Sequence, residues 1–157
     1  MKQFDIVVPV VAYKYDELTP GRRTLVDMAR EASSRAYAPY SRFSVGAAIR
    51  LDNGEIVTGS NQENAAFPSG LCAERTAAYY AHSRFPDARF EAIAIAAIDT
   101  TGHEIAVPVA PCGACRQALT EYEKLAGHDV EVILVGAGEI YVLPSVASTL
   151  PLTFREF

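Results

Sequence analysis

The chain has 157 residues, of which half are hydrophobic and 21% are charged, as in ordinary globular domains. Its 19 acidic and 14 basic residues give a net charge of −5. This charge balance argues against a nucleic acid polymer as a partner, since proteins that bind phosphate backbones present a basic face. No stretch is apolar over the length that a membrane span requires. We therefore expect a single domain over residues 1–157 that binds a small ligand, either uncharged or weakly charged.

Residues 4–13, FDIVVPVVAY, are the first apolar segment, and they predict an extra strand or an ordered arm within residues 1–18. Pro9 argues against a central strand because it has no N–H to donate. The segment is a poor match to a signal peptide. Three cysteines cannot all pair within one chain. We therefore expect reduced thiols and a cytoplasmic protein.

The first helix is predicted to begin at Thr19-Pro20, an N-cap residue followed by proline at the first helical position. Residues 43–51, FSVGAAIRL, alternate in apolar character, which predicts a half-buried strand. Residues 52–54, DNG, form a strong turn signal. Residues 55–61 should therefore return beside this strand as its hairpin partner.

The rest of the chain alternates between helical and strand patterns. Residues 72–84 and 115–125 predict helices. Residues 91–98, 130–135 and 139–143 predict strands. The first of these is apolar after Glu91, as expected for a strand covered on both faces. The alternation predicts an α/β fold, a three-layer α/β/α sandwich around a mixed central sheet.

The three cysteines fall at the starts of two predicted helices. Cys72 opens the first, and Cys112 and Cys115 lie at the start of the second. Unpaired N–H groups and the helix dipole stabilise thiolates there. Three thiolates leave one position of a tetrahedral Zn²⁺ site open to water, which is typical of catalytic zinc. A Cys-x-x-Cys pair also fits a thiol–disulfide exchanger, so the pair by itself leaves both readings open.

Histidine does not complete the site in this interpretation. His82 would lie about 15 Å along the helix axis from Cys72, and His103 and His128 fall in predicted turns. Glu74, two residues after Cys72, can instead reach a water molecule on zinc and exchange a proton with it. Arg75 or Arg116 is placed to offset the negative charge of three thiolates. The C-A-E … P-C-x-x-C combination matches a zinc deaminase pattern.

The motifs together resemble the small, three-cysteine type of free-nucleoside cytidine deaminase. The resemblance extends from about Arg22 to Phe154. It is carried by four segments: AYAPYSRFSVGAA at 36–48, NQENAAFPSGLCAERTA at 61–77, PCGACRQ at 111–117 and, more weakly, SVASTLPLTF at 145–154. It implies a cytidine deaminase-like fold that binds one Zn²⁺ per subunit. It also implies a homotetramer whose sites are shared across subunits.

The resemblance also implies roles for individual residues. Cys72, Cys112 and Cys115 would bind zinc and Glu74 would be the proton shuttle. Substrate contacts would come from Phe43 beside the base, the Ala73 backbone at O2, Asn61 and Glu63 at the ribose hydroxyl, and Phe154 in a neighbouring subunit's site. Arg75 would bond to a zinc thiolate. Phe67 departs from the family, whose members often have tyrosine there, and this puts a hydroxyl contact near the ribose 5′ end in doubt.

The sequence therefore predicts zinc-dependent hydrolysis of cytidine and 2′-deoxycytidine to uridine and 2′-deoxyuridine with release of ammonia, in pyrimidine salvage. Two alternatives stay open at this stage. An aminohydrolase for another cytosine nucleoside, such as a nucleoside antibiotic, would keep the zinc motif but need not keep N-x-E-N. A non-catalytic protein would use zinc as a structural staple or Cys112–Cys115 as a redox pair.

Overall fold

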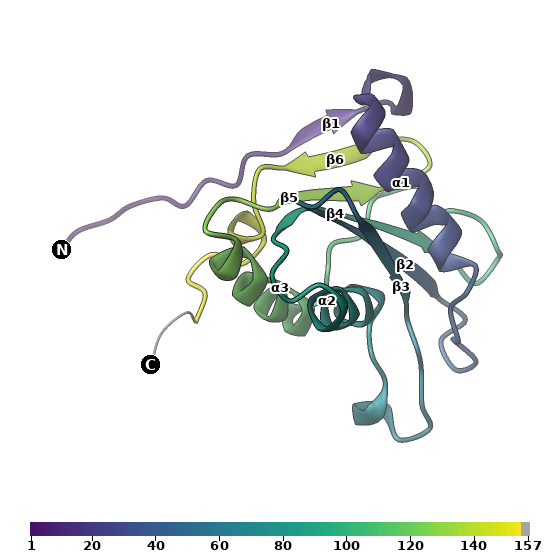
Figure 1. Ribbon diagram of the computed structural model, residues 1–157. Coiled ribbons are helices and arrows are strands. Elements are labelled where there is room, and N and C mark those ends of the chain that lie inside the picture. Colours follow the sequence, from purple (N-terminus) through teal and green to yellow (C-terminus); the bar gives the residue numbers. More distant parts are fainter. Residues whose placement is uncertain (155–157) are drawn as a thin grey trace.

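The computed structural model describes residues 1–154 and contains, within that range, one six-stranded sheet with helices on both faces (Figure 1). The strands are β1 (Val11–Tyr13), β2 (Ser44–Leu51), β3 (Ile56–Ser60), β4 (Phe90–Ile98), β5 (Glu131–Val135) and β6 (Ile140–Leu143). The helices are α1 (Pro20–Ser33), α2 (Ala73–Arg84) and α3 (Gly113–Ala126), with short 3-10 turns η1 (Tyr15–Glu17), η2 (Phe67–Ser69) and η3 (Ala147–Thr149). None of the helices in residues 1–154 has the length and apolar character needed to cross a bilayer.

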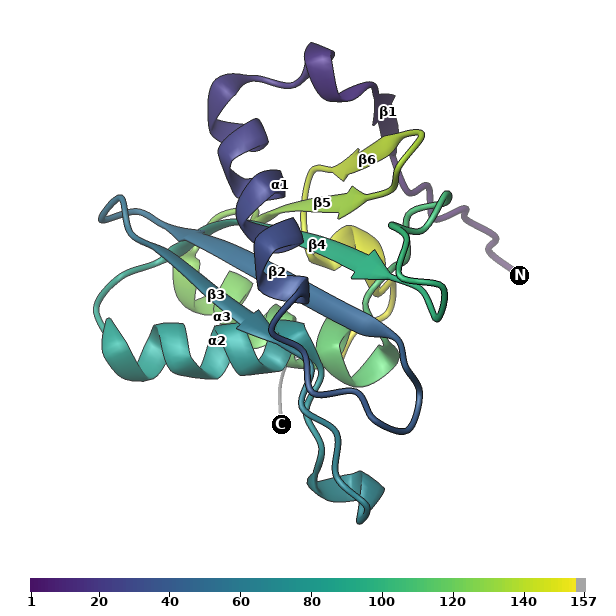
Figure 2. The same cartoon turned by 90° about the vertical axis from the view of Figure 1, so that its right-hand side faces the viewer.

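The sheet has the order β1-β6-β5-β4-β2-β3 and is mixed. Only the β4–β5 pair among these neighbours is parallel, and the four other pairs are antiparallel. Helix α1 covers one face, while α2 and α3 lie side by side on the other (Figures 1 and 2). This arrangement confirms the predicted three-layer sandwich. It also brings the N-termini of α2 and α3 together at one end of the molecule.

Strand β2 corrects one expectation, because it is covered on both faces and not on one. Ala47 and Ile49 pack into the core beneath α2 and α3, as the alternation predicts. Ala48, on the other face, is equally buried beneath α1. At Gly46 a Cβ atom would lie 2.1 Å from the Ala29 carbonyl oxygen of α1. Gly46 and Ala48, which the alternation places on the solvent side, are small because the α1 backbone lies directly on this part of the strand.

The predicted starts and turns are confirmed with small shifts. The Thr19 hydroxyl accepts a hydrogen bond from the Arg22 N–H, so Thr19 caps α1. Gly54 has a φ of +85° in the turn between β2 and β3, a conformation that glycine adopts without steric strain. Helix α3 begins at Gly113, two residues earlier than predicted. The earlier start follows from Cys112, which occupies the N-cap position.

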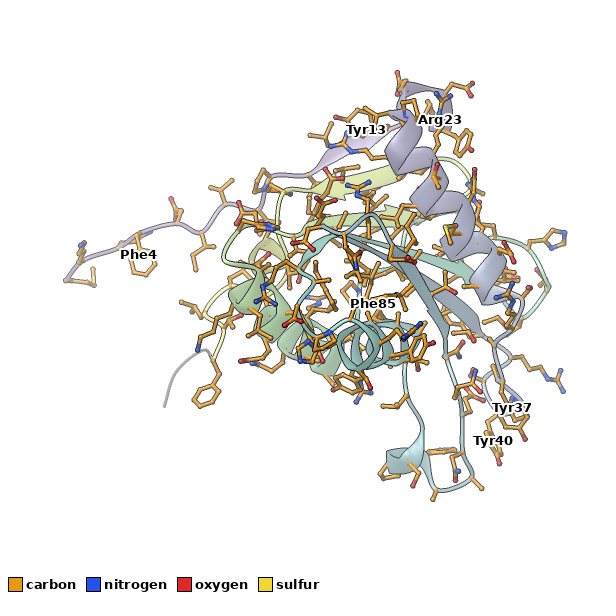
Figure 3. The ribbon with its side chains drawn as sticks, in the orientation of Figure 1. Phe4, Tyr13, Arg23, Tyr37, Tyr40 and Phe85 are labelled. Atoms are coloured by element: carbon orange, nitrogen blue, oxygen red, sulfur yellow. The ribbon has the colours of Figure 1, made fainter. Side chains whose placement is uncertain are left out.

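The N-terminal segment is an arm that ends in a short edge strand. Residues 1–10 have no regular secondary structure and extend away from the body (Figures 1 and 3). Phe4 and Val7 are 70% and 80% exposed. The arm then joins the sheet through β1, which pairs with β6 at its edge. An edge position is consistent with the Pro9 argument.

Candidate metal centre

The candidate metal centre lies where the N-termini of α2 and α3 meet. Cys72 is the N-cap residue of α2, and Cys112 is the N-cap residue of α3. Neither side chain caps its own helix by a hydrogen bond. Cys115 lies in the first turn of α3 and is fully buried. Both helix dipoles therefore present their positive ends to the three sulfurs, as predicted from the sequence.

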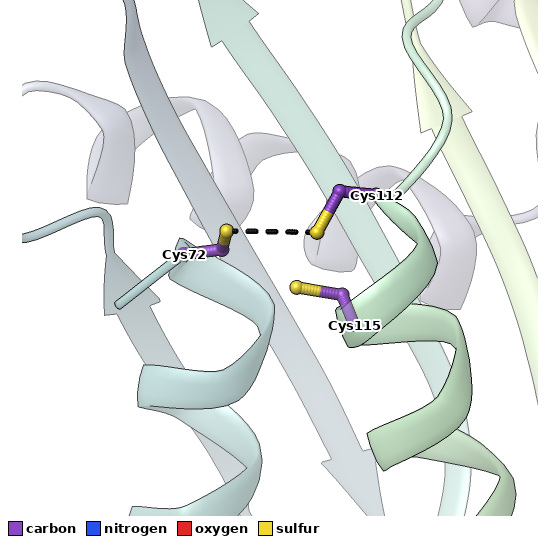
Figure 4. Close-up of side chains that lie close together, drawn as sticks. All are labelled: Cys72, Cys112 and Cys115. Atoms are coloured by element: carbon purple, nitrogen blue, oxygen red, sulfur yellow. Dashed lines mark hydrogen bonds between the residues drawn. The ribbon is translucent and has the colours of Figure 1, made fainter. Parts of the chain in front are cut away.

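The three sulfur atoms have the spacing of a metal-binding trio. All lie within 4.8 Å of one another, and the Cys72 and Cys112 Sγ atoms are 3.8 Å apart (Figure 4). A disulfide requires about 2.05 Å, so these are free thiols. Tetrahedral zinc with Zn–S bonds of about 2.3 Å separates its sulfur ligands by about 3.8 Å. The donor set fits one zinc ion, and this favours the metal interpretation over the redox pair.

Charge and hydrogen bonding prepare Cys72 for metal binding. Hydrogen bonds from the Cys115 thiol and from Arg75 lower the pKa of Cys72 to about 5. The Arg75 Nη2 atom lies 3.7 Å from the Cys72 sulfur. The pKa of Cys115 is raised because its thiol donates to Cys72, is buried and lies near Glu74. A dication held by all three cysteines must displace the remaining protons, so binding releases protons.

Arg75, and not Arg116, contacts the cysteine cluster. The Arg116 guanidinium donates from Nε to the Pro111 carbonyl at 2.6 Å, and from Nη1 to the Thr149 carbonyl at 2.8 Å. It therefore binds the backbone just before α3 and the backbone of η3. The sequence offered Arg75 and Arg116 as cations that could offset the thiolate charge. The geometry favours Arg75 for this role.

Glu74 is buried in the first turn of α2, with 4% of its surface exposed. Loss of solvent raises the pKa of its carboxyl, and the nearby Cys72 charge raises it further. A carboxyl whose pKa moves towards neutrality can both accept and return a proton during a reaction. Its surroundings thus suit the proton-transfer role that the sequence suggests.

A pocket of about 500 Å³ opens beside Cys72, within the range of small-molecule sites. Its lining includes four of the predicted site residues: Asn61, Glu63, Cys72 and Arg75. The other lining residues are Tyr40, Ser41, Gln62, Asn64, Phe67, Gly70 and Leu71. The pocket therefore joins the metal centre to the N-x-E-N segment.

Asn61 and Glu63 are held by backbone groups in this pocket. The Asn61 amide accepts from Val45 N–H at 2.7 Å and donates to the Phe43 carbonyl at 2.9 Å, so it extends the β2 edge like a peptide group. Glu63 accepts from the N–H groups of Tyr40 and Ser41 at 2.8 and 3.3 Å. A hydrogen bond from the Ser41 side chain lowers the pKa of Glu63 most strongly. Each side chain keeps further donor or acceptor capacity for a ligand.

Three other predicted substrate contacts lie outside the residues that line this pocket. Phe43 is half-buried at the entrance to β2. Ala73 is buried as the first residue of α2. Phe154 is 62% exposed, and its carbonyl accepts a hydrogen bond from Gln117 Nε2 at 2.8 Å. The structure of one chain does not bring Phe154 into its own pocket.

Tyr40 is a pocket residue that the sequence reasoning missed. Its ring meets Phe67 edge-on, with centroids 5.8 Å apart, and Figure 3 shows it beside Tyr37 at the lower end of the molecule. Both Tyr40 and Phe67 are exposed. The available signal was indirect, because Tyr40 lies inside the resemblance segment but in a loop without periodicity.

The histidines stay away from the cysteine cluster, as expected. The His82 ring packs 5.6 Å from that of Tyr122. His103 pairs with Thr101, and the His128 ring nitrogen lies 3.0 Å from the Asp129 carbonyl oxygen. Among residues 1–154, the cysteine trio is the group whose ligand atoms converge for a metal.

Comparisons with known proteins agree with this geometry. A family model for the cytidine and deoxycytidylate deaminase zinc-binding region matches residues 21–126, which include the three cysteines and Glu74. Cytidine deaminase of Halalkalibacterium halodurans is 42% identical over 113 residues, 72% of this chain and 78% of that protein. Cytidine deaminase of Mycobacterium tuberculosis is 41% identical over 105 residues, 65% of this chain and 74% of that protein.

The fold comparison points the same way. The crystal structure of cytidine deaminase from Burkholderia pseudomallei matches with a TM-score of 0.72 at 37% identity, covering 87% of this chain and all of that one. The sequence match includes more than half of the chain and the full cysteine cluster. The chain therefore belongs to the cytidine and deoxycytidylate deaminase family defined by this zinc-binding region.

Proposed function

We propose that this protein hydrolyses cytidine and 2′-deoxycytidine to uridine and 2′-deoxyuridine with release of ammonia. The observation that carries the proposal is the convergence of three cysteine sulfurs within 4.8 Å, beside buried Glu74 and a pocket of about 500 Å³. The names of the relatives support the same substrate class. The pocket residues Asn61 and Glu63 favour a nucleoside over a free base.

The chemistry divides between the metal and Glu74. Cys72, Cys112 and Cys115 would hold zinc, which when bound lowers the pKa of a water molecule and so supplies a nucleophile at neutral pH. Glu74 would accept a proton from the attacking water and deliver it to N3 of the cytosine ring. Glu74 would then pass the second water proton to the leaving N4, so that one water and one cytidine give uridine and ammonia.

Substrate orientation would come from the pocket. Asn61 and Glu63 would hydrogen-bond a ribose hydroxyl, which is both donor and acceptor, through the capacity that their backbone contacts leave. Such a site rejects free cytosine because its own polar groups would stay unpaired. Phe43 would pack beside the base, and the Ala73 backbone would contact O2. Arg75 would moderate the thiolate charge through its contact with Cys72.

The Glu74→Gln variant tests the proposal. Uridine and ammonia release from cytidine would be followed with zinc-loaded protein, and zinc content would be measured by elemental analysis. We expect Glu74→Gln to keep zinc and lose about 100- to 10,000-fold in turnover, the range of general acid–base catalysis. The exposed Glu55→Gln variant, in the turn after β2, is the matched control and should behave as wild type.

The possible outcomes test the role of Glu74 and the substrate assignment separately. An active Glu74→Gln protein would remove Glu74 from the mechanism. A zinc-loaded, folded wild type without turnover on either nucleoside would contradict the substrate assignment and leave a modified cytosine nucleoside or a structural metal.

The proposal extends to assembly and setting. Residues 1–157 would form a single domain, and the chain would assemble as a homotetramer. Phe154 would reach a neighbouring subunit's site, in keeping with its exposure and with a pocket lining that does not include it. The three free cysteines suit a reducing compartment such as the cytoplasm. Reuse of pyrimidine nucleosides is the role that this activity would serve.

A further inference from the structure

Helix α3 holds the C-terminal segment, residues 145–154, with one row of side chains. The Glu123 carboxylate accepts from the N–H groups of Val146 and Ala147 at 2.7 and 2.9 Å. Arg116 donates to the Thr149 carbonyl at 2.8 Å. Positions 116 and 123 are seven residues apart and so share one face of the helix. The helix that carries Cys112 and Cys115 at its start is therefore the support of this segment.

Arg116 is the member of this row that also contacts the backbone next to the cysteine cluster. Its Nε atom donates to the carbonyl of Pro111 at 2.6 Å, and Pro111 directly precedes Cys112. The Cys112 side chain does not cap α3, so its own hydrogen bonding does not fix the entry turn. The planar guanidinium holds two carbonyls in fixed directions. One side chain thus connects the backbone before a cysteine of the trio with Thr149 of η3, which is 33 residues after Arg116.

We propose that Arg116 is a positioning residue that couples the metal centre to the C-terminal segment. It fixes the turn that aims Cys112 at the cluster, and through Thr149 it fixes the segment that ends at Phe154. The coupling is reciprocal, as any linkage between two sites must be. Metal binding therefore orders the segment, and the segment contributes to metal retention. The inference rests on the proposed zinc ligands.

Zinc release measures the first half of the coupling. Holoprotein is mixed with the chelating dye 4-(2-pyridylazo)resorcinol, and the release rate is compared between wild type, Arg116→Gln and Arg116→Lys. We expect Arg116→Gln to release zinc about 10-fold faster, the lower end for groups that support metal ligands. Arg116→Lys keeps the charge but cannot reproduce the two-carbonyl geometry, so its rate should lie between the two. Arg50→Gln, which loses an ion pair to Glu91 on the sheet, is the control and should match wild type.

Trimming by carboxypeptidase measures the second half in the wild-type protein. Removal of residues beyond Phe154 towards Leu150 is followed by mass spectrometry, with zinc bound and after chelation. We expect faster trimming in the metal-free protein, and we expect this dependence on zinc to disappear in Arg116→Gln. A residue that only stabilised the fold would raise trimming without removing its dependence on zinc.

Each result decides the inference. Folded Arg116→Gln protein with wild-type zinc release would overturn it, and so would wild-type trimming that is the same with and without zinc. If Arg116→Gln does not fold, the wild-type comparison decides alone. A wild type that takes up no zinc at all would contradict the proposed function and with it the inference, whereas a zinc-loaded protein without the Arg116 effect would contradict the inference only.

Discussion

Arg75 and Cys72 lie three positions apart at the start of α2, which places the guanidinium over the thiol at the N-cap. At this scale the site depends on single contacts: the 3.7 Å approach of Arg75 Nη2 to sulfur, and the burial of Glu74 one residue away. Arg75 stabilises negative charge that would otherwise repel Glu74. The same short stretch thus places the proposed metal ligand and the proposed proton carrier beside a cation.

The Arg75→Gln variant tests this arrangement in metal-free protein. Removing the cation should raise the pKa of Cys72 from about 5 towards the ordinary thiol value of about 8.5. The rate of Cys72 alkylation by iodoacetamide would be measured against pH, with mass spectrometry to identify the modified cysteine. The midpoint of the profile should move to higher pH in the variant. Arg84→Gln, at the other end of α2, should leave it in place, and an unmoved Arg75→Gln midpoint would rule out the role of the contact.

At the scale of elements, the two faces of the central strands β2 and β4 carry residues of different size. Where helix α1 packs on β2 and β4, the sheet residues beneath it are small: Gly46 and Ala48 from β2 with Ala92, Ala94 and Ala96 from β4. The opposite face carries the larger Ile49, Ile93 and Ile95 beneath α2 and α3. At β2 and β4 the side chains beneath α1 are therefore small, and those beneath the two helices of the site are larger.

The Gly46→Ala variant tests how closely the α1 backbone packs on β2. The new Cβ would lie 2.1 Å from Ala29 O and 2.3 Å from Ser33 N, both backbone atoms, so α1 must shift. We expect a loss of about 2–3 kcal/mol in the free energy of unfolding, measured by urea denaturation. Gly21→Ala in α1 meets only the flexible end of Arg50 at 3.4 Å and should stabilise the protein by about 0.5–1 kcal/mol. Equal stability of the two variants would contradict this view of the α1 contact.

Local sequence signals predict the elements well and their environment less well. The Thr19 cap, the Gly54 turn and the apolar run of β4 are written in residues that lie close together in the chain, and each is confirmed. Gly46 and Ala48 of β2 are buried by α1, a helix that does not show in the hydrophobic pattern of the strand itself. The alternation of residues 43–51 alone therefore predicted that this face of β2 is exposed to solvent. The cysteine trio was predictable because both predicted helices begin with a cysteine at or beside the N-cap position. Tyr40, in a loop without periodicity, was not.

At the scale of the whole molecule, two of the regions that carry exposed apolar side chains are the pocket rim and the C-terminal segment. Tyr40, Phe67 and Leu71 surround the pocket, whereas Leu152 and Phe154 lie on the C-terminal segment. Apolar side chains left in solvent at a pocket rim and at a chain terminus are typical of surfaces that other subunits cover. The proposed tetramer gives both regions a partner.

The mass in solution tests that assembly. Light scattering coupled to size-exclusion chromatography should give about four times the 17.0 kDa chain mass. The Phe154→Ala variant should raise KM for cytidine more than it lowers kcat, since the ring would contact substrate in a neighbouring subunit. A monomer with full activity would refute the shared-site proposal, and a tetramer in which Phe154→Ala has wild-type kinetics would refute the role of the ring.

The N-terminal arm has a consequence for behaviour at high protein concentration. Residues 6–11, IVVPVV, combine strong strand propensity with no charge, and their side chains are exposed. Without its proline, such a six-residue segment would match the sequences that stack into cross-β fibrils. Pro9 interrupts that stacking because it cannot donate to a backbone ladder, and Asp5 adds a repulsive charge at the flank. Pro9 is thus a gatekeeper against fibril formation, so the residue that kept the arm out of a central strand also protects the protein from aggregation.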